Sequence, residues 1–112
     1  MTGASSHWRL QRLTAIALVP LGLWFLFSIL SLPDASHATV WRFLSQPLAA
    51  LLTALFAGTA LWHSMQGLQV IVEDYVGGRL QRPTLAVLRF LHAVLALAAA
   101  WAIATIATAG GA

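Results

Sequence analysis

The hydrophobic residues of the chain fall into three long runs separated by short polar stretches. The runs cover about residues 13–32, 47–72 and 85–108. A helix needs roughly 20 apolar residues to cross the hydrocarbon of a bilayer, and each run is long enough. The pattern therefore predicts an all-α membrane protein with three transmembrane helices. With short connections and no internal repeat, we expect residues 1–112 to form one small bundle, a single domain.

The composition points to the same class of protein. Of 112 residues, 60% are hydrophobic and only 8% are charged, and the mean hydropathy is +0.83. A soluble domain of this size would leave much of that apolar surface in water. The chain also contains no cysteine, which excludes a disulfide framework or a thiolate-held cluster within it.

Five of the six basic residues gather at one end of the predicted bundle. They are Arg9 and Arg12 before the first span and Arg79, Arg82 and Arg89 around the second connection; the first connection, at the other end, carries only Arg42. Positive charge marks the cytoplasmic side, so we expect a cytoplasmic N-terminus and a periplasmic C-terminus in a bacterial inner membrane. The net charge of +3 is then a topology signal and gives no reason to expect a nucleic-acid partner.

The second run carries polar groups in an apolar setting, in the stretch LWHSMQGLQVIVEDY. Its histidine, His63, lies roughly 14 Å from Val72 if the helix rises about 1.5 Å per residue. Ionisable side chains at that depth are rare in membranes and typical of functional sites. The structural alternative is a neutral imidazole that hydrogen-bonds between helices.

Gly67 lies one helical turn beyond His63. At about 100° per residue, Gly67, Val70 and Asp74 fall within roughly 40° of His63, on one stripe of the helix. The missing side chain leaves room for a flat macrocycle, although close packing against another helix is an alternative. Since the span has one imidazole and no cysteine or carboxylate beside it, haem iron is favoured over zinc.

Asp74 and Tyr75 lie where the predicted helix reaches the cytoplasmic interface. A phenol beside a carboxylate can donate to a carbonyl and pass protons from water. The alternatives are an aromatic belt for Tyr75 and a solvated helix end for Glu73 and Asp74. If both groups of residues are functional, the helix carries two separate sites.

These residues form a pattern that resembles a known family. The N-terminal segment reads HWRLQRLTAIALVPLGLW, and the second span reads H-x3-G-x-Q-x4-DY, formed by His63, Gly67, Gln69, Asp74 and Tyr75. Both are similar to the smaller hydrophobic membrane-anchor subunit of succinate dehydrogenase (respiratory complex II), of the cytochrome b556 type. The resemblance covers nearly the whole chain, and the third span matches only in being hydrophobic.

The resemblance implies a non-catalytic subunit of an enzyme complex. Such an anchor packs with a second three-helix anchor, a cytochrome b subunit, and the two hold one haem b. The flavoprotein and iron–sulfur subunits dock on the cytoplasmic side. The complex oxidises succinate in the tricarboxylic acid cycle and passes the electrons to ubiquinone in aerobic electron transport.

The family's functional residues carry over by position. His63 is the expected axial haem ligand, with the second ligand from the partner, and Gly67 gives the haem clearance. Arg12 is expected near the haem propionates. Asp74 and Tyr75 are expected to border the ubiquinone site, with Tyr75 donating to a quinone carbonyl and Asp74 on the proton path.

Two histidines and two rival functions stay open. His92 has a similar depth in the third span, so a haem held by His63 and His92 is conceivable, although we expect His92 to pack or hydrogen-bond. His7 is a weaker candidate for the propionate region. The rival functions are a haem-free structural anchor and a small proton-conducting component that uses His63 and Asp74.

Overall fold

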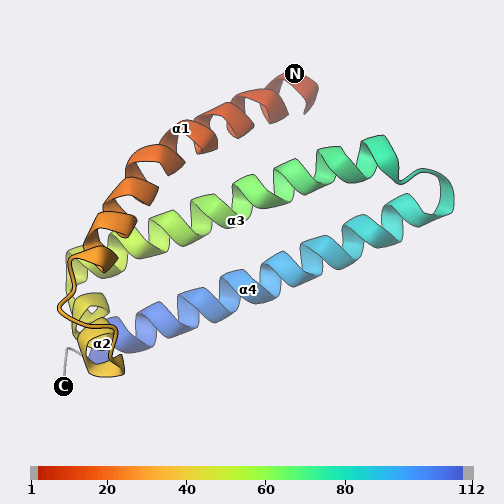
Figure 1. Cartoon of the computed structure of the whole chain (residues 1–112). Helices are drawn as coiled ribbons and strands as arrows, with labels where there is room; N and C mark the ends of the chain where they lie inside the picture. Colours follow the sequence, from red (N-terminus) through yellow and green to blue (C-terminus); the bar gives the residue numbers. More distant parts are fainter. Residues whose placement is uncertain (1–2, 110–112) are drawn as a thin grey trace.

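A computed structural model describes residues 3–109, which are almost entirely helical (Figure 1). The elements are α1 (Gly3–Leu30), α2 (His37–Ser45), α3 (Pro47–Tyr75), the 3-10 helix η1 (Gly78–Leu80) and α4 (Gln81–Ala109). Three segments are long and apolar enough to cross a membrane: Ser6–Leu30, Pro47–Tyr75 and Gly78–Ala109. The predicted all-α class with three transmembrane helices is confirmed.

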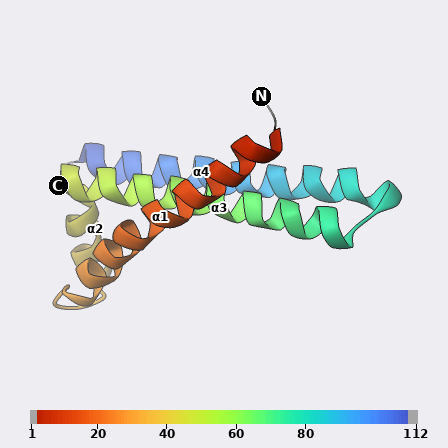
Figure 2. The ribbon, with the colours of Figure 1, turned by 90° about the horizontal axis from the view of Figure 1, so that it is seen from above.

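Helix α3 lies at the centre of the bundle. It packs against α1, α2 and α4, whereas α1 and α4 do not pack against each other within the described residues. Figure 1 shows α3 and α4 running antiparallel from a short turn, and Figure 2 shows α1 crossing them at an angle. The outer helices therefore lie on different sides of α3, and a groove floored by α3 separates their N-terminal parts.

The helices extend beyond the apolar runs. Helix α1 begins at Gly3, whereas the hydrophobic pattern begins near residue 13, and α4 begins at Gln81 instead of near residue 85. Hydropathy marks the part of a helix that lies in lipid, and the polar residues beyond it continue the same backbone. The turn after α3 contains Gly78 at a φ of +64°, a conformation that glycine adopts without steric cost.

The sequence analysis expected only a short connection between the first two apolar runs, but the structure has helix α2 there. Its nine residues are too few to cross a bilayer, so hydropathy did not reveal them. The ring of Phe43 stacks on Trp24 of α1 with the centroids 5.9 Å apart, and Thr39 is buried. Helix α2 also packs on α3 and α4, so it closes the end of the bundle opposite the α3–α4 turn.

The start of α2 is organised by Asp34. Its Oδ1 accepts from the backbone N–H of Ser36 at 2.9 Å and from the hydroxyl of Thr39 at 2.7 Å. The Ser36 hydroxyl oxygen in turn accepts from the Thr39 N–H at 3.2 Å, which is a helix N-cap. Hydrogen bonds from the Ser36 side chain, the Thr39 side chain and the Ser36 backbone lower the pKa of Asp34 from 3.8 to about 2.

Very little of the apolar surface is buried inside the chain. Among the described residues, the buried apolar ones are Ala49, Ala50, Val72 and Leu85, and no large side chain is fully buried. Large exposed side chains such as Leu97 and Trp101, 72% and 77% exposed, line the outer faces. Such surfaces fit lipid tails and neighbouring helices, as expected of a multi-pass membrane protein.

We predict that ionised Asp34 stabilises the start of α2. Because its pKa is lower in the folded chain than in the unfolded one, the contribution is complete above about pH 4 and is lost as the pH falls toward about 2. In an Asp34→Ala variant at neutral pH, the α2 amides should exchange with solvent faster than in the unchanged protein, as measured by hydrogen-exchange mass spectrometry. Asp74→Ala, an exposed acid at the other end of the bundle, serves as the control, and equal α2 exchange in both variants would contradict the prediction.

Candidate functional site

His63 lies in the middle of α3, where α1 crosses it. Its Nδ1 atom is 2.9 Å from the hydroxyl oxygen of Thr14 on α1. The same hydroxyl is 2.9 Å from the Leu10 carbonyl and 3.0 Å from the Gln11 carbonyl. Among residues 3–109 no hydrogen bond to Nε2 of His63 is seen. Helix α1 therefore engages one ring nitrogen, and the described part of the chain leaves the other available.

The surface of α3 is open beside His63. A Cβ atom added at Gly67 would meet no neighbouring atom within 4 Å. Gly22 of α1 differs, because its Cβ would lie 3.6 Å from the ring of Phe56, which also stacks on Phe25 at 5.2 Å. Gly22 therefore lies at the contact between α1 and α3, whereas no other described helix packs against Gly67.

His92 uses both ring nitrogens within the chain. Its Nδ1 is 2.8 Å from the Leu88 carbonyl oxygen, and its Nε2 is 3.1 Å from the Ser64 hydroxyl. A carbonyl oxygen can only accept, so Nδ1 carries the proton and Nε2 accepts from Ser64. The expectation that His92 is a hydrogen-bonding histidine is confirmed, and the bond joins α4 to α3.

Asp74 and Tyr75 form the last two positions of α3. Both are exposed, Tyr75 at 83%, and neither side chain forms a hydrogen bond or ion pair with the described part of the chain. Nearby, Gln69 donates to Glu73 at 3.3 Å. The phenol and the carboxylate are therefore available to water, lipid or another molecule, and their contact with a quinone stays a prediction.

Arg12 lies away from the contact between α1 and α3. At about 100° per residue it is roughly 160° around α1 from Thr14, and its guanidinium stacks over Trp8, 5.1 Å from the ring centroid. Its side chain is exposed and forms no ion pair within residues 3–109. The predicted place of Arg12 near haem propionates is not tested by these contacts.

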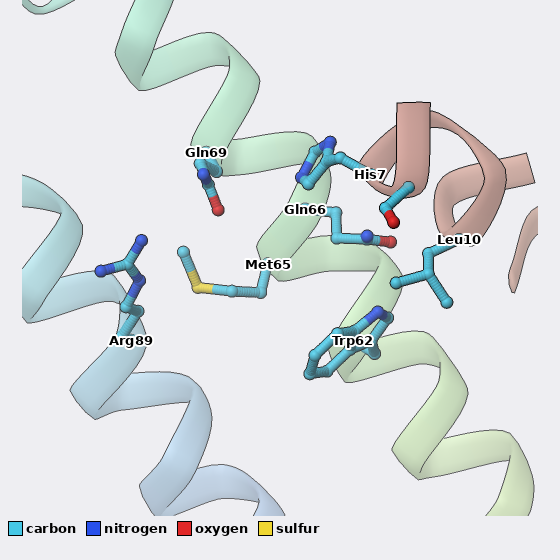
Figure 3. Close-up of a pocket in the computed structure, with 8 residues that line it drawn as sticks. His7, Leu10, Trp62, Met65, Gln66, Gln69 and Arg89 are labelled. Carbon is cyan, nitrogen blue, oxygen red and sulfur yellow. The ribbon is translucent and has the colours of Figure 1, made fainter. Parts of the chain in front are cut away.

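A second feature is the groove between α1 and α4, which encloses about 430 Å³. Figure 3 shows His7 of α1 on one side, Arg89 of α4 on the other, and Gln66 and Trp62 of α3 between them, with the Gln66 side chain directed toward α1. Gln66 is only 5% exposed, and neither its Oε1 nor the buried Nε2 of His7 has a hydrogen-bond partner among residues 3–109. Gln66 was not singled out from the sequence, although an amide within an apolar run is a visible signal.

The described residues contain no group of three or more His, Cys, Asp or Glu side chains arranged to hold a metal ion. A metal at His63 would thus take at most two ligands from this part of the chain, too few to close a coordination shell without another molecule. One neutral imidazole with an open Nε2 is the donor that a shared haem iron requires.

The comparison with protein families gives these features a context. The family model described as "Succinate dehydrogenase/Fumarate reductase transmembrane subunit" matches residues 3–107. The chain belongs to this family. The resemblance noted in the N-terminal segment and in the second span is confirmed.

Individual relatives of this anchor agree with the family model. The succinate dehydrogenase hydrophobic membrane anchor subunit of Rickettsia bellii is 35% identical over 96 residues, or 85% of this chain and 76% of the relative. The succinate dehydrogenase membrane anchor subunit of Reclinomonas americana is 37% identical over 81 residues, covering 70% and 68%. A hydrophobic membrane anchor subunit from Paracoccus denitrificans is 29% identical over 76 residues, covering 68% and 58%.

We predict that the bond between Ser64 and His92 stabilises this anchor. A Ser64→Ala variant loses the hydrogen bond between α3 and α4, which costs about 0.6 kcal/mol and at most about 1.7 kcal/mol in a membrane bundle. The thermal unfolding midpoint of the purified complex should fall. Ser45→Ala is the matched control, because the Ser45 hydroxyl donates only to Trp41 in its own helix, at 2.7 Å. Equal midpoints in the two variants would contradict the prediction.

Proposed function

We propose that this chain is the membrane-anchor subunit of a succinate dehydrogenase and that His63 supplies one axial ligand to a b-type haem shared with a second anchor subunit. The observation that carries the proposal is the hydrogen bonding of the two nitrogens of the His63 ring. Nδ1 lies 2.9 Å from Thr14, and Nε2 has no partner in the described chain. The open stretch of α3 at Gly67 adjoins it.

The residues present fit such a group. His63 offers a neutral nitrogen donor, and Gly67 removes the side chain that would otherwise occupy the space one turn away. Arg12 carries a cation that has no ion pair within residues 3–109. It lies on the face of α1 turned away from Thr14, so in this proposal it meets a propionate at the edge of the ring and not beside His63. When bound, the haem provides one-electron transfer inside the membrane; this chain orients the ligand and leaves space for the ring.

The end of α3 is the second part of the proposal. We propose that Tyr75 and Asp74 border a ubiquinone site completed by the iron–sulfur subunit. The Tyr75 hydroxyl donates to a quinone carbonyl and stabilises negative charge as it develops on that oxygen. The Asp74 carboxylate, open to water, passes protons toward the same place. Their exposure and lack of partners within the chain support this role.

The arrangement of charges supports an orientation for the complex. All the arginines except Arg42 cluster at the end with the α1 N-terminus and the α3–α4 turn, so we assign that end to the cytoplasm and the C-terminus to the periplasm of a bacterial inner membrane. The flavoprotein and iron–sulfur subunits then dock on the cytoplasmic side, beside Tyr75. The exposed apolar faces of α1 and α4 are available to the second anchor and to lipid.

The haem assignment predicts different outcomes for the two membrane histidines. In the purified complex, His63→Ala should abolish the six-coordinate b-type signal in a reduced-minus-oxidised spectrum, because the iron loses a ligand. His92→Ala should retain it, because both nitrogens of His92 are already bonded. If only the His92 change abolished the signal, the ligand assignment would be wrong. A b-type signal missing from the unchanged complex would favour a haem-free anchor.

The quinone assignment predicts a selective defect for Tyr75→Phe. Loss of one hydrogen bond, worth about 1.4 kcal/mol, should lower succinate-dependent quinone reduction about tenfold. Succinate oxidation with an artificial acceptor and the haem content should not change. Trp101→Phe alters an exposed aromatic residue of α4 and is the control for an aromatic-belt role. Equal quinone reduction in the two variants would count against a quinone contact at Tyr75.

A further inference from the structure

We propose that Thr14 is a positioning residue: its hydroxyl accepts a hydrogen bond from Nδ1–H of His63 and thereby fixes the tautomer whose Nε2 lone pair is free for a metal. This inference deepens the proposed function and rests on it. The two residues involved are Thr14 of α1 and His63 of α3, and of these only His63 would touch the haem.

The proton count at Thr14 gives the direction of the hydrogen bond. A threonine hydroxyl has one proton and two acceptor lone pairs. Its oxygen lies 2.9 Å from the Leu10 carbonyl and 3.0 Å from the Gln11 carbonyl, and both carbonyls can only accept. Threonine in a helix commonly donates its proton back to such carbonyls. The remaining neighbour, Nδ1 of His63 at 2.9 Å, is then the donor.

His92 provides a comparison within the same molecule. The Leu88 carbonyl fixes His92 in the Nδ1–H tautomer as well, but the Ser64 hydroxyl occupies Nε2. The two histidines therefore share a tautomer and differ in whether Nε2 is available. In this proposal the role of each histidine depends on which ring nitrogen lies beside a hydroxyl: Nδ1 of His63 beside Thr14, and Nε2 of His92 beside Ser64.

The partner of Nδ1 also affects the ligand's strength. A hydrogen bond from the far nitrogen of a ligating histidine fixes the ring and raises its basicity, and loss of such a partner typically costs 10- to 100-fold in metal affinity. A more basic imidazole stabilises oxidised iron, so it lowers the reduction potential. Thr14, on a different helix, is thus placed to tune both the retention and the potential of the haem.

The test compares variants in the intact complex. Thr14→Val keeps the shape of the side chain and removes the hydroxyl, whereas Thr14→Ser keeps the hydroxyl. Thr108→Val is the matched control, because the Thr108 hydroxyl donates to Ala104 in the same back-bonded way, at 2.7 Å, and meets no histidine. The readouts are the haem retained on dilution, the haem midpoint potential and the electron paramagnetic resonance spectrum of the oxidised haem.

We expect Thr14→Val to weaken haem retention about tenfold or more, to raise the midpoint potential and to shift the resonance spectrum. Thr14→Ser and Thr108→Val should match the unchanged complex. If Thr14→Val matches Thr108→Val in all three readouts, the proposal is overturned. If His63→Ala removes the haem while Thr14→Val changes nothing, the positioning role fails and the ligand assignment stands. Full haem retention in His63→Ala would instead remove the ligand assignment itself.

A measurement without substitution covers the case in which Thr14→Val fails to assemble. In the reduced complex, with this subunit carrying ¹⁵N-histidine, the Nδ1 proton of His63 should be visible by NMR and protected from exchange with water. A rapidly exchanging Nδ1 proton would overturn the proposal, because the hydrogen bond to Thr14 would then be absent.

Discussion

The structure depends on the contacts that α3 makes with its neighbouring helices, because the hydrophobic effect does not drive helices together inside a bilayer. In a bilayer, apolar surface gains little by leaving lipid, so helices associate through close packing and hydrogen bonds. Helix α3 has both kinds of contact. Gly22 of α1 lies against the ring of Phe56, and the hydroxyl of Ser64 binds His92 of α4. These contacts position each imidazole, so the chemistry available to His63 depends on how the helices pack.

The sequence predicted the elements that hydropathy and charge determine, and little beyond them. The three spans and His63 could be located because an apolar run makes a polar residue visible, and Gly67 followed from its spacing of one helical turn from His63. Helix α2 was missed because nine residues give no span-length signal, and its cap depends on Asp34. The contact of Thr14 with His63 joins positions 49 residues apart, so only the crossing of α1 over α3 reveals it.

Depth alone did not separate His63 from His92. Both lie well inside apolar runs, and the sequence allowed either to be a ligand or a structural residue. The difference comes from neighbours on other turns and other helices: a carbonyl and a serine hydroxyl for His92, and a threonine hydroxyl already directed to its own backbone for His63. Such hydrogen-bond directions are tertiary properties, so no pattern along a single chain could have given them.

The groove between α1 and α4 bears on the biogenesis of the subunit. Buried polar atoms without partners are costly in lipid, where no water can replace the missing bond. Gln66 Oε1, within the apolar run of α3, is such an atom in the described chain. A newly inserted copy that has not met its companions carries this cost in full, and any companion that offers a donor or a bridging water removes it. The unpartnered amide in the groove therefore favours association over the isolated chain.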